Sequence, residues 1–227
     1  MTASYQGRTF LGVDLSSARV PIFPISNESI EAVVVGLNPG SNDSVLTVAG
    51  SGDQAFALLE KAGNVVIADI SEAQLELVRK RKDALEAGDY ETFFMPTGSD
   101  YELFNAYPRI RYFDRMSRLD RIQERLSKLE ICGSVSLEDL AESRSFDMIY
   151  ASNAISEFYC ANPLEVHFAM LLRGLKIGGL LYVSNGAEIH NLVKDIHRLG
   201  LELESSMTKK AQALEDLWTP NVYRKTS

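Results

Sequence analysis

Short apolar runs alternate with longer amphipathic segments through most of the chain, and turn residues separate them. Two runs rich in β-branched residues, 45–49 and 65–68, have the length and composition of buried parallel strands. Between these runs, apolar residues at positions 55, 58, 59 and 62 recur with helical spacing, and Gly63 ends the predicted helix. The pattern therefore predicts a strand, a glycine turn at residues 50–52, a helix and a second strand.

The alternation of strands and helices continues on both sides of this unit. Residues 30–37 form a predicted leading helix, and residues 71–88 form a helix that opens with a capping box. Further strands are predicted at residues 129–132, from Asp147 onward, at 201–205 and at 221–224. Two further helices are predicted over residues 114–129 and 189–199. This order is typical of a doubly wound α/β protein with a mostly parallel sheet.

Composition and charge narrow the classes of partner. The chain has 227 residues, a net charge of -8 and a sequence pI near 5.0, so it lacks the broad basic surface that nucleic acid or an anionic membrane requires. A small-molecule substrate is therefore expected, with no nucleic acid and no stable membrane insertion, and a homodimer is left open. Only Cys132 and Cys160 are present, without a signal peptide or a transmembrane-length apolar run, which favours the cytoplasm.

A single domain is predicted over residues 1–227, with two parts that stand apart from the regular alternation. Residues 1–43 form an N-terminal lid or cap, although plain packing explains the leading helix equally well. Residues 89–127 contain an aromatic-rich insertion. The aromatic rings either form a wall of an active site that attracts a cation, or a small satellite core under a long loop.

The glycine turn and the acid that follows the second strand indicate a nucleoside site. Gly50-x-Gly52-x-x-Ala55 satisfies the dinucleotide fingerprint, and Asp69 has roughly the spacing of a ribose-binding acid. A pyrophosphate at this helix N-terminus would meet the Asp53 carboxylate, and like charges repel. S-adenosylmethionine has no phosphate, so its ribose suits Asp69 and its ammonium suits Asp53. A structural turn without a ligand is the alternative.

The unit from Ser44 to Asp69 resembles the cofactor-binding part of class I S-adenosylmethionine-dependent methyltransferases. Residues 171–183 are similar to the helix, glycine turn and fifth strand of the same superfamily. The resemblance implies a Rossmann-like sheet of seven strands whose last strand is antiparallel, and S-adenosyl-L-methionine as the cofactor. The cofactor-binding residues predicted at the ligand edge are Ala49, Gly50, Gly52, Asp53, Asp69, Ile70, Ser134, Val135, Ser152 and Asn153. The resemblance implies that Ser134 and Val135 lie on the adenine side.

Four stretches carry a narrower resemblance. Residues 45–55, 71–84, 90–94 and 148–155 are similar to the diacylglycerol 3-amino-3-carboxypropyltransferases of betaine-lipid synthesis. Those enzymes imply attack at the γ-carbon of S-adenosylmethionine, with release of methylthioadenosine, rather than attack at the methyl carbon. This chain is shorter than expected of those lipid enzymes and lacks a basic amphipathic helix, so a soluble acceptor is expected in place of a lipid.

Three functions remain compatible with the sequence. The first is a transferase that moves the 3-amino-3-carboxypropyl group to a small molecule, or that cyclises the cofactor's own tail to azetidine-2-carboxylate. In either case, we predict that Asn153 orients the aminocarboxypropyl group and that Tyr159, or a tyrosine of the insertion, shields the sulfonium. The second is a small-molecule methyltransferase, and the third is a binding module without catalysis.

Other catalytic classes lack their signatures in this sequence. His167, His190 and His197 form no metal-ligand set with either cysteine, so no metal is expected. Gly-x-Ser-x-Gly and Gly-Lys-Ser/Thr are both absent, which excludes an esterase elbow and a P-loop.

Overall fold

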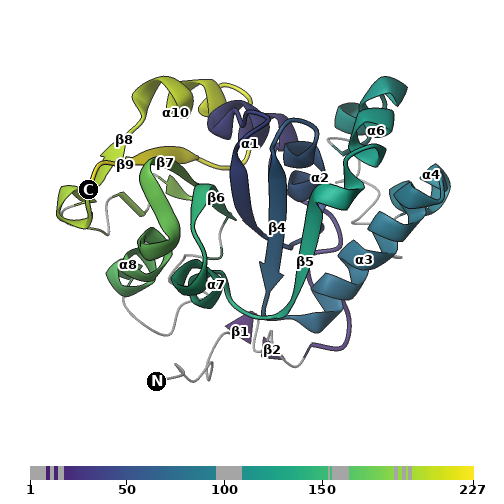
Figure 1. Cartoon of the computed structure of the whole chain (residues 1–227), viewed down its shortest axis with the longest axis horizontal. Coiled ribbons are helices and arrows are strands. Elements are labelled where there is room, and N and C mark those ends of the chain that lie inside the picture. Colours follow the sequence, from purple (N-terminus) through teal and green to yellow (C-terminus); the bar gives the residue numbers. More distant parts are fainter. Residues whose placement is uncertain are drawn as a thin grey trace.

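The computed structural model describes residues 9–10, 13–14, 18–95, 109–152, 154, 164–186, 189–190, 193 and 196–227. Over these residues a seven-stranded sheet runs through the middle of the molecule, with helices packed against both of its faces (Figure 1). A separate antiparallel pair, β1 (Thr9–Phe10) and β2 (Val13–Asp14), lies near the N-terminus.

The strand order confirms the predicted α/β fold. Across the sheet, the strands are β5 (Leu129–Ser134), β4 (Asn64–Asp69), β3 (Ser44–Val48), β6 (Phe146–Ser152), β7 (Leu175–Val183), β9 (Asn221–Lys225) and β8 (Leu201–Leu203). The first five are parallel, and β9 is antiparallel to both of its neighbours. The order reverses between β3 and β6, which is where open α/β sheets bind ligands.

Two apolar clusters fill the space between the sheet and the helices. One lies under α1 (Ile30–Leu37), α2 (Asp53–Leu59), α3 (Glu72–Glu86), α4 (Tyr90–Phe94), α6 (Met116–Gln123) and α10 (Ser205–Gln212). The other lies under α7 (Leu137–Ser143), α8 (Leu164–Gly174) and the 3-10 turn η3 (Ile196–Leu199). Strands covered on both faces must be apolar throughout, which explains their unbroken apolar runs.

Local sequence signals set several helix ends as predicted. The Ser29 hydroxyl caps α1 by accepting a hydrogen bond from the backbone N–H of Ala32, and Ser71 caps α3 in the same way. Asn38 ends α1 in the left-handed conformation, with φ of 47°. These caps fix where the chain enters and leaves the ligand edge of the sheet.

Some predicted boundaries are wrong. Strand β5 continues through Ser134 instead of ending at Cys132, because residues 129–131 and Ser134 pair with β4 across a bulge. The helix predicted over residues 114–129 is divided into α6 and the 3-10 turn η2 (Leu126–Lys128). Helices α7 and α10 were not predicted. The helix expected over residues 189–199 lies partly outside the described residues.

The described part of the aromatic insertion belongs to the core. Phe93, Tyr112 and Phe113 are buried and pack edge to face in pairs with ring centroids 5.0–5.4 Å apart. These rings are part of the first apolar cluster, so they form neither a separate satellite core nor, in the described residues, a wall of the cavity. Residues 96–108 of the insertion lie outside the described residues.

Candidate active site

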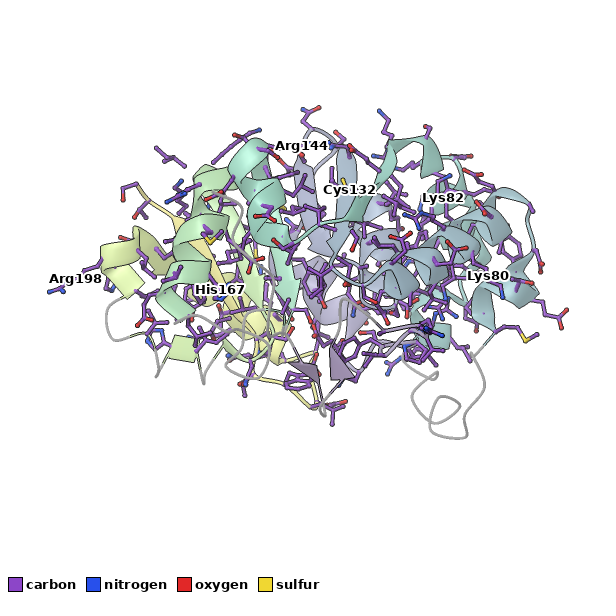
Figure 2. The ribbon with its side chains drawn as sticks, turned by 90° about the horizontal axis from the view of Figure 1, so that it is seen from below. Lys80, Lys82, Cys132, Arg144, His167 and Arg198 are labelled. Atoms are coloured by element: carbon purple, nitrogen blue, oxygen red, sulfur yellow. The ribbon has the colours of Figure 1, made fainter. Side chains whose placement is uncertain are left out.

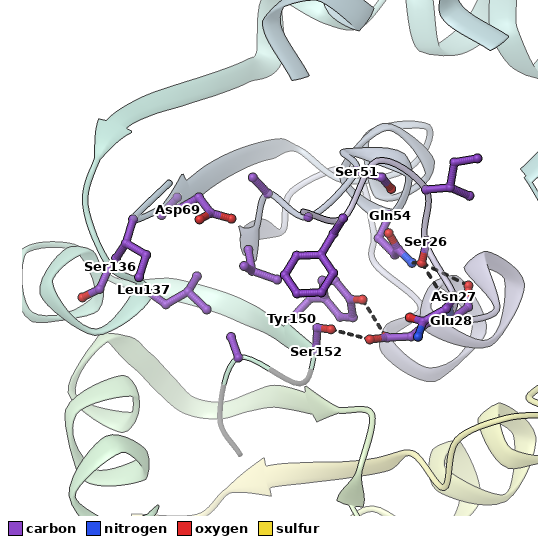
Figure 3. Close-up of a pocket in the computed structure, with 18 of the residues that line it drawn as sticks. Ser26, Asn27, Glu28, Ser51, Gln54, Asp69, Ser136, Leu137, Tyr150 and Ser152 are labelled. Atoms are coloured by element: carbon purple, nitrogen blue, oxygen red, sulfur yellow. Dashed lines mark hydrogen bonds between the residues drawn. The ribbon is translucent and has the colours of Figure 1, made fainter. Parts of the chain in front are cut away.

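A cavity of about 290 Å³ opens at the carboxyl ends of β3, β4 and β6. Five of the predicted cofactor-binding residues line it: Ala49, Gly50, Asp69, Ile70 and Ser152. They lie at the ends of their strands or in the turns that follow, so the parallel sheet brings them to one edge. Figure 3 shows Asp69 toward one end of this cavity and Glu28 toward the other, with Tyr150 and Ser152 between them.

The glycine turn brings backbone to the wall of the cavity. Gly50 has φ of +45°, and a Cβ at this position would meet no atom within 4 Å. Gly52 has φ of +83° and is closely surrounded, because a Cβ added at this position would lie 3.1 Å from atoms of Phe56 and of Val78. Gly50 therefore keeps the cavity wall open, whereas Gly52 permits α2 and α3 to pack closely and does not line the cavity.

The Asp69 end of the cavity is built by the turns after β4 and β5. Asp69 Oδ1 accepts a hydrogen bond from the backbone N–H of Ser71 at 2.9 Å. Ser134 and Val135 were predicted to contact the adenine, but neither is among the described lining residues. The Ser134 hydroxyl donates to the Ile70 carbonyl at 2.6 Å, and Val135 N–H donates to the Asp69 carbonyl at 3.0 Å.

The length of β5 explains why Ser134 and Val135 do not line the cavity. Because β5 extends through Ser134, the connection to α7 begins later than predicted. The side chains that reach the cavity are consequently those of Ser136 and Leu137. Ser136 also caps α7, which fixes its position at the cavity edge.

At the opposite end, the N-terminal segment forms part of the cavity wall. Residues 23–28 form a strap across this end. Five of them line the cavity, and none was predicted as a site residue: Phe23, Ile25, Ser26, Asn27 and Glu28. The Gln74 side chain holds this strap to the glycine turn. Its Oε1 accepts from the Phe23 N–H at 3.0 Å, while its Nε2 donates to the carbonyl oxygens of Phe23 and Gly50. A part of the predicted lid over residues 1–43 thus forms the cavity wall.

Glu28 places a carboxyl group at this end of the cavity although the residue is only 4% exposed. Its Oε2 accepts hydrogen bonds from the hydroxyls of Tyr150, at 2.6 Å, and of Ser184. Its Oε1 accepts from the hydroxyl of Ser152 (Figure 3). The three donors come from β6 and from the end of β7, so the sheet edge itself positions the carboxyl group.

The burial of Glu28 alters its titration. Burial raises the pKa of Glu28 above the usual 4.5, while the hydroxyls of Ser152, Ser184 and Tyr150 oppose the rise. The charge of Glu215 adds to it. A carboxyl group with a raised pKa is a stronger base than an ordinary one, which suits proton transfer near neutral pH.

Ser152 has a backbone conformation that is uncommon for its residue type. Its φ of 53° is in the left-handed region, where a residue with a Cβ is strained by about 1 kcal/mol. The conformation ends β6 and turns the hydroxyl toward Glu28. Strain held by surrounding structure is typical of binding and catalytic positions.

The structure does not bring Asp53, predicted to contact a ligand ammonium, to the cavity. Asp53 is fully buried, does not line the cavity, and forms an ion pair with Arg109 at 2.6 Å between Oδ1 and Nε. Arg81 lies 3.8 Å from the same oxygen, and the Ser51 hydroxyl donates to Oδ2 at 2.8 Å. Burial alone would raise the pKa of Asp53, but the two guanidinium groups lower it below 3.8. The carboxylate is therefore neutralised inside the protein.

The aromatic side chains that reach the cavity are not those predicted. Phe23, Tyr150 and Trp218 line it, and Trp218 Nε1 donates to the Asn27 carbonyl at 3.2 Å. None of the described aromatic residues of the insertion does so. Asn153 and Tyr159, predicted to orient and shield the cofactor tail, lie outside the described residues, so their roles stay predictions.

Metal ligands are not assembled in the described part of the chain: no group of three or more His, Cys, Asp or Glu residues has a suitable arrangement. His167 Nδ1 lies 2.7 Å from Glu138 Oε1 in a buried pair between α8 and α7. Figure 2 shows His167 well separated from Cys132. Within the described residues, no helix combines the length and apolar character needed to cross a bilayer.

No protein-family model matches the sequence, and no curated protein does. Solved structures do share the fold. A ribosomal protein L11 methylase from Lactobacillus delbrueckii subsp. bulgaricus is 16% identical, with a TM-score of 0.51 over 88% of this chain and 79% of that one. The cyclase SpnF is 13% identical, with a TM-score of 0.53 over 87% and 79% of the two chains.

A third similar structure is the N-methyltransferase NodS from Bradyrhizobium japonicum, solved in complex with S-adenosyl-l-homocysteine. It is 9% identical, with a TM-score of 0.53 over 94% of this chain and 95% of that one. At these identities the similarity establishes the fold, which is the α/β fold of class I methyltransferases. The chemistry has to be argued from the cavity itself.

Proposed function

We propose that this protein binds S-adenosylmethionine in the cavity and catalyses attack at the γ-carbon of its methionine part, releasing methylthioadenosine. The charge of the cavity is the observation on which the choice of ligand depends. Among the described lining residues, the charged ones are Asp69 and Glu28, and both are acidic. Such a lining favours a cation and disfavours the pyrophosphate of a dinucleotide.

The residues at the two ends suit the two parts of this ligand. Asp69 follows the second strand of the βαβ unit, where an acid binds a ribose diol, and Ser136 and Leu137 lie beside it. Gly50 allows the ligand to approach the backbone closely. The tail of the ligand would then extend toward Tyr150, Ser152 and Glu28. Trp218 and Phe23 offer aromatic faces to the sulfonium.

Attack at the γ-carbon is supported by the resemblance to aminocarboxypropyltransferases together with the closure of the tail end. Residues 23–28 cover this end, and the volume of about 290 Å³ is at the lower limit of ligand pockets, which is about 300 Å³. A small or internal nucleophile fits such a site better than a lipid. Covering the tail also excludes water, which would otherwise compete as a nucleophile.

Methyl transfer to a small molecule is the second candidate. The buried carboxyl group of Glu28 would serve equally well as a proton acceptor for a methyl acceptor that carries an exchangeable hydrogen. The two candidates differ in the nucleoside that they release, because attack at the methyl carbon leaves S-adenosylhomocysteine.

The deciding experiment is to incubate the purified protein with S-adenosylmethionine alone and then with a cell extract, and to identify the nucleoside product by mass spectrometry. Methylthioadenosine above the uncatalysed rate supports γ-carbon chemistry, and its formation without extract supports cyclisation. S-adenosylhomocysteine that forms only with extract would establish methyl transfer instead. Heat-denatured protein provides the uncatalysed rate.

A further inference from the structure

Glu28 has a function that the binding of a nucleoside alone does not require. The acid that suits the ribose is Asp69, and Figure 3 shows Glu28 well separated from it across the cavity. The carboxyl group of Glu28 is held by hydroxyls from two strands, and the residue is 4% exposed. These partners offset the cost of burying the carboxyl group, and they hold it in the wall of the cavity.

We propose that the nucleophile in this site is an amine, which binds as an ammonium ion beside Glu28 and gives its proton to the Glu28 carboxylate. This inference rests on the proposed function, because it names the class of nucleophile for that reaction. The amine belongs either to the cofactor's own methionine part or to a second substrate. Both sources present the same chemistry to the carboxylate.

The surroundings of Glu28 suit an ammonium ion. Serine and tyrosine hydroxyls can accept as well as donate hydrogen bonds, so they can turn away from the carboxylate when a stronger donor arrives. A hydrogen bond between two charged groups is about twice as strong as a neutral one. The charge of Glu215 further favours a cation at this position, and Trp218 lines the same cavity with an aromatic ring.

Burial makes the proton transfer feasible. In water an α-amino group, with a pKa of about 7.7–8.0, does not give its proton to a glutamate with a pKa of about 4.3. Burial raises the pKa of the Glu28 carboxyl, and a buried ammonium has its pKa lowered for the same reason. Burial thus narrows the difference between the two pKa values and lowers the cost of proton transfer from the ammonium to the carboxylate.

The reaction balances with these groups alone. Glu28 takes one proton from the ammonium, and the nitrogen lone pair that is released forms a bond to the γ-carbon. The bond between the γ-carbon and sulfur breaks with its electron pair on sulfur, so the sulfonium becomes the neutral thioether of methylthioadenosine. The Glu28 carboxyl group then returns its proton to water, which leaves one proton in solution for each turnover.

The test is a thermodynamic cycle measured by calorimetry on the full chain. The ligands are S-adenosylhomocysteine and its analogue in which hydrogen replaces the α-amino group. The proteins are the wild type, Glu28→Gln, and Glu31→Gln as the matched control, since Glu31 is an exposed acid in the first turn of α1, the helix that follows Glu28. For the second source of the amine, n-propylammonium is titrated into each protein saturated with the analogue.

If the amine belongs to the cofactor, the analogue without the α-amino group should bind the wild type and Glu31→Gln about tenfold or more weakly than S-adenosylhomocysteine does. For Glu28→Gln the two ligands should differ by less than about twofold. A second-substrate amine predicts that n-propylammonium binds the wild-type complex and fails to bind Glu28→Gln. Equal losses in all three proteins, with no binding of n-propylammonium, would overturn the inference. If the wild type binds no S-adenosylhomocysteine at all, the proposed function fails and the inference fails with it.

A second variant keeps the test decisive if Glu28→Gln does not fold, which circular dichroism would reveal. Tyr150→Phe removes one donor from the carboxylate and leaves the carboxylate itself in place. The loss of this donor raises the pKa of Glu28 further, so the acid limit of amine binding should move to higher pH. An unchanged acid limit in Tyr150→Phe would count against the role of Glu28.

Discussion

The Asp53 carboxylate and the Arg109 guanidinium form a buried ion pair, with 2.6 Å between Oδ1 and Nε and at most 2% of either side chain exposed. The pair joins the first residue of α2 to a residue that lies 56 positions later in the chain. The Arg109 guanidinium also lies over the ring of Phe93, 4.5 Å from its centroid. The pair therefore holds the glycine turn against the aromatic part of the core.

Removal of Arg109 should destabilise the protein strongly. Arg109→Met leaves the Asp53 charge buried with Arg81 at 3.8 Å as its remaining cation, and a broken buried pair costs about 3–5 kcal/mol. We expect a loss of about 3 kcal/mol in the free energy of unfolding, measured by urea denaturation. Arg111→Met, which changes an exposed arginine two residues away, should lose less than about 0.5 kcal/mol. Equal losses in the two variants would contradict this role.

The same pair predicts how stability responds to acid. The pKa of Asp53 is lower in the folded state than its usual 3.8, so the unfolded chain binds the proton more tightly. The stabilisation from Asp53 is complete above pH 3.8, and it is lost as the pH falls through the pKa that Asp53 has in the folded state. In acid titrations followed by circular dichroism, Arg109→Met should lose less stability than the wild type below about pH 4. Parallel titration curves would show that the pair does not carry this dependence.

Strands β3, β4 and β6 and their ligand edge were predictable, because each is a short apolar run and its last residue lies beside the cavity. Strand β3 and strand β4 begin one residue before their predicted positions, and Asp69 ends β4 as predicted. Ala49, Gly50 and Asp69 line the cavity as predicted, because the position of a residue at the end of a strand follows from local sequence.

The other half of the site depends on contacts between distant residues, which no local pattern reveals. Glu28 meets the Tyr150 hydroxyl across 122 positions of sequence, and its neighbours Ser26 and Ser29 made it look like part of a helix cap. The partner of Asp53, Arg109, lies 56 positions away in sequence, so local sequence left the Asp53 carboxylate available for a ligand. Only the packed structure shows which acid faces the cavity and which is neutralised.

Gly50 should be required for ligand binding rather than for folding. In Gly50→Ala the new methyl group would lie at the cavity wall, and the left-handed φ would cost about 1 kcal/mol of stability. Gly88→Ala is the matched control, since Gly88 also has a positive φ and open space around it but does not line the cavity. Both variants should lose similar stability, while calorimetry with S-adenosylhomocysteine should show weaker binding by about tenfold in Gly50→Ala alone.

Gln74 should control how tightly the strap of residues 23–28 closes the cavity. Gln74→Leu removes hydrogen bonds to Phe23 and to the Gly50 carbonyl, each worth about 0.5–1.5 kcal/mol. Amide hydrogens of residues 23–28 should exchange faster in this variant, as measured by mass spectrometry, and those of β3 should not change. Unchanged exchange in the strap would show that other contacts hold it.

Glu28 should give the stability of the protein a pH dependence opposite to that of Asp53. Burial raises the pKa of Glu28 above 4.5, so the folded state binds this proton more tightly than the unfolded chain. The contribution of Glu28 to stability is therefore complete below pH 4.5, and it is lost as the pH rises through the pKa that Glu28 has in the folded state. Urea denaturation should show the wild type gaining on Glu28→Gln as the pH falls from about 8 to about 4.5, by about 1.4 kcal/mol per unit of pKa elevation. Glu31→Gln should follow the wild type, and a constant difference for Glu28→Gln would mean that the carboxyl titrates as it does in water.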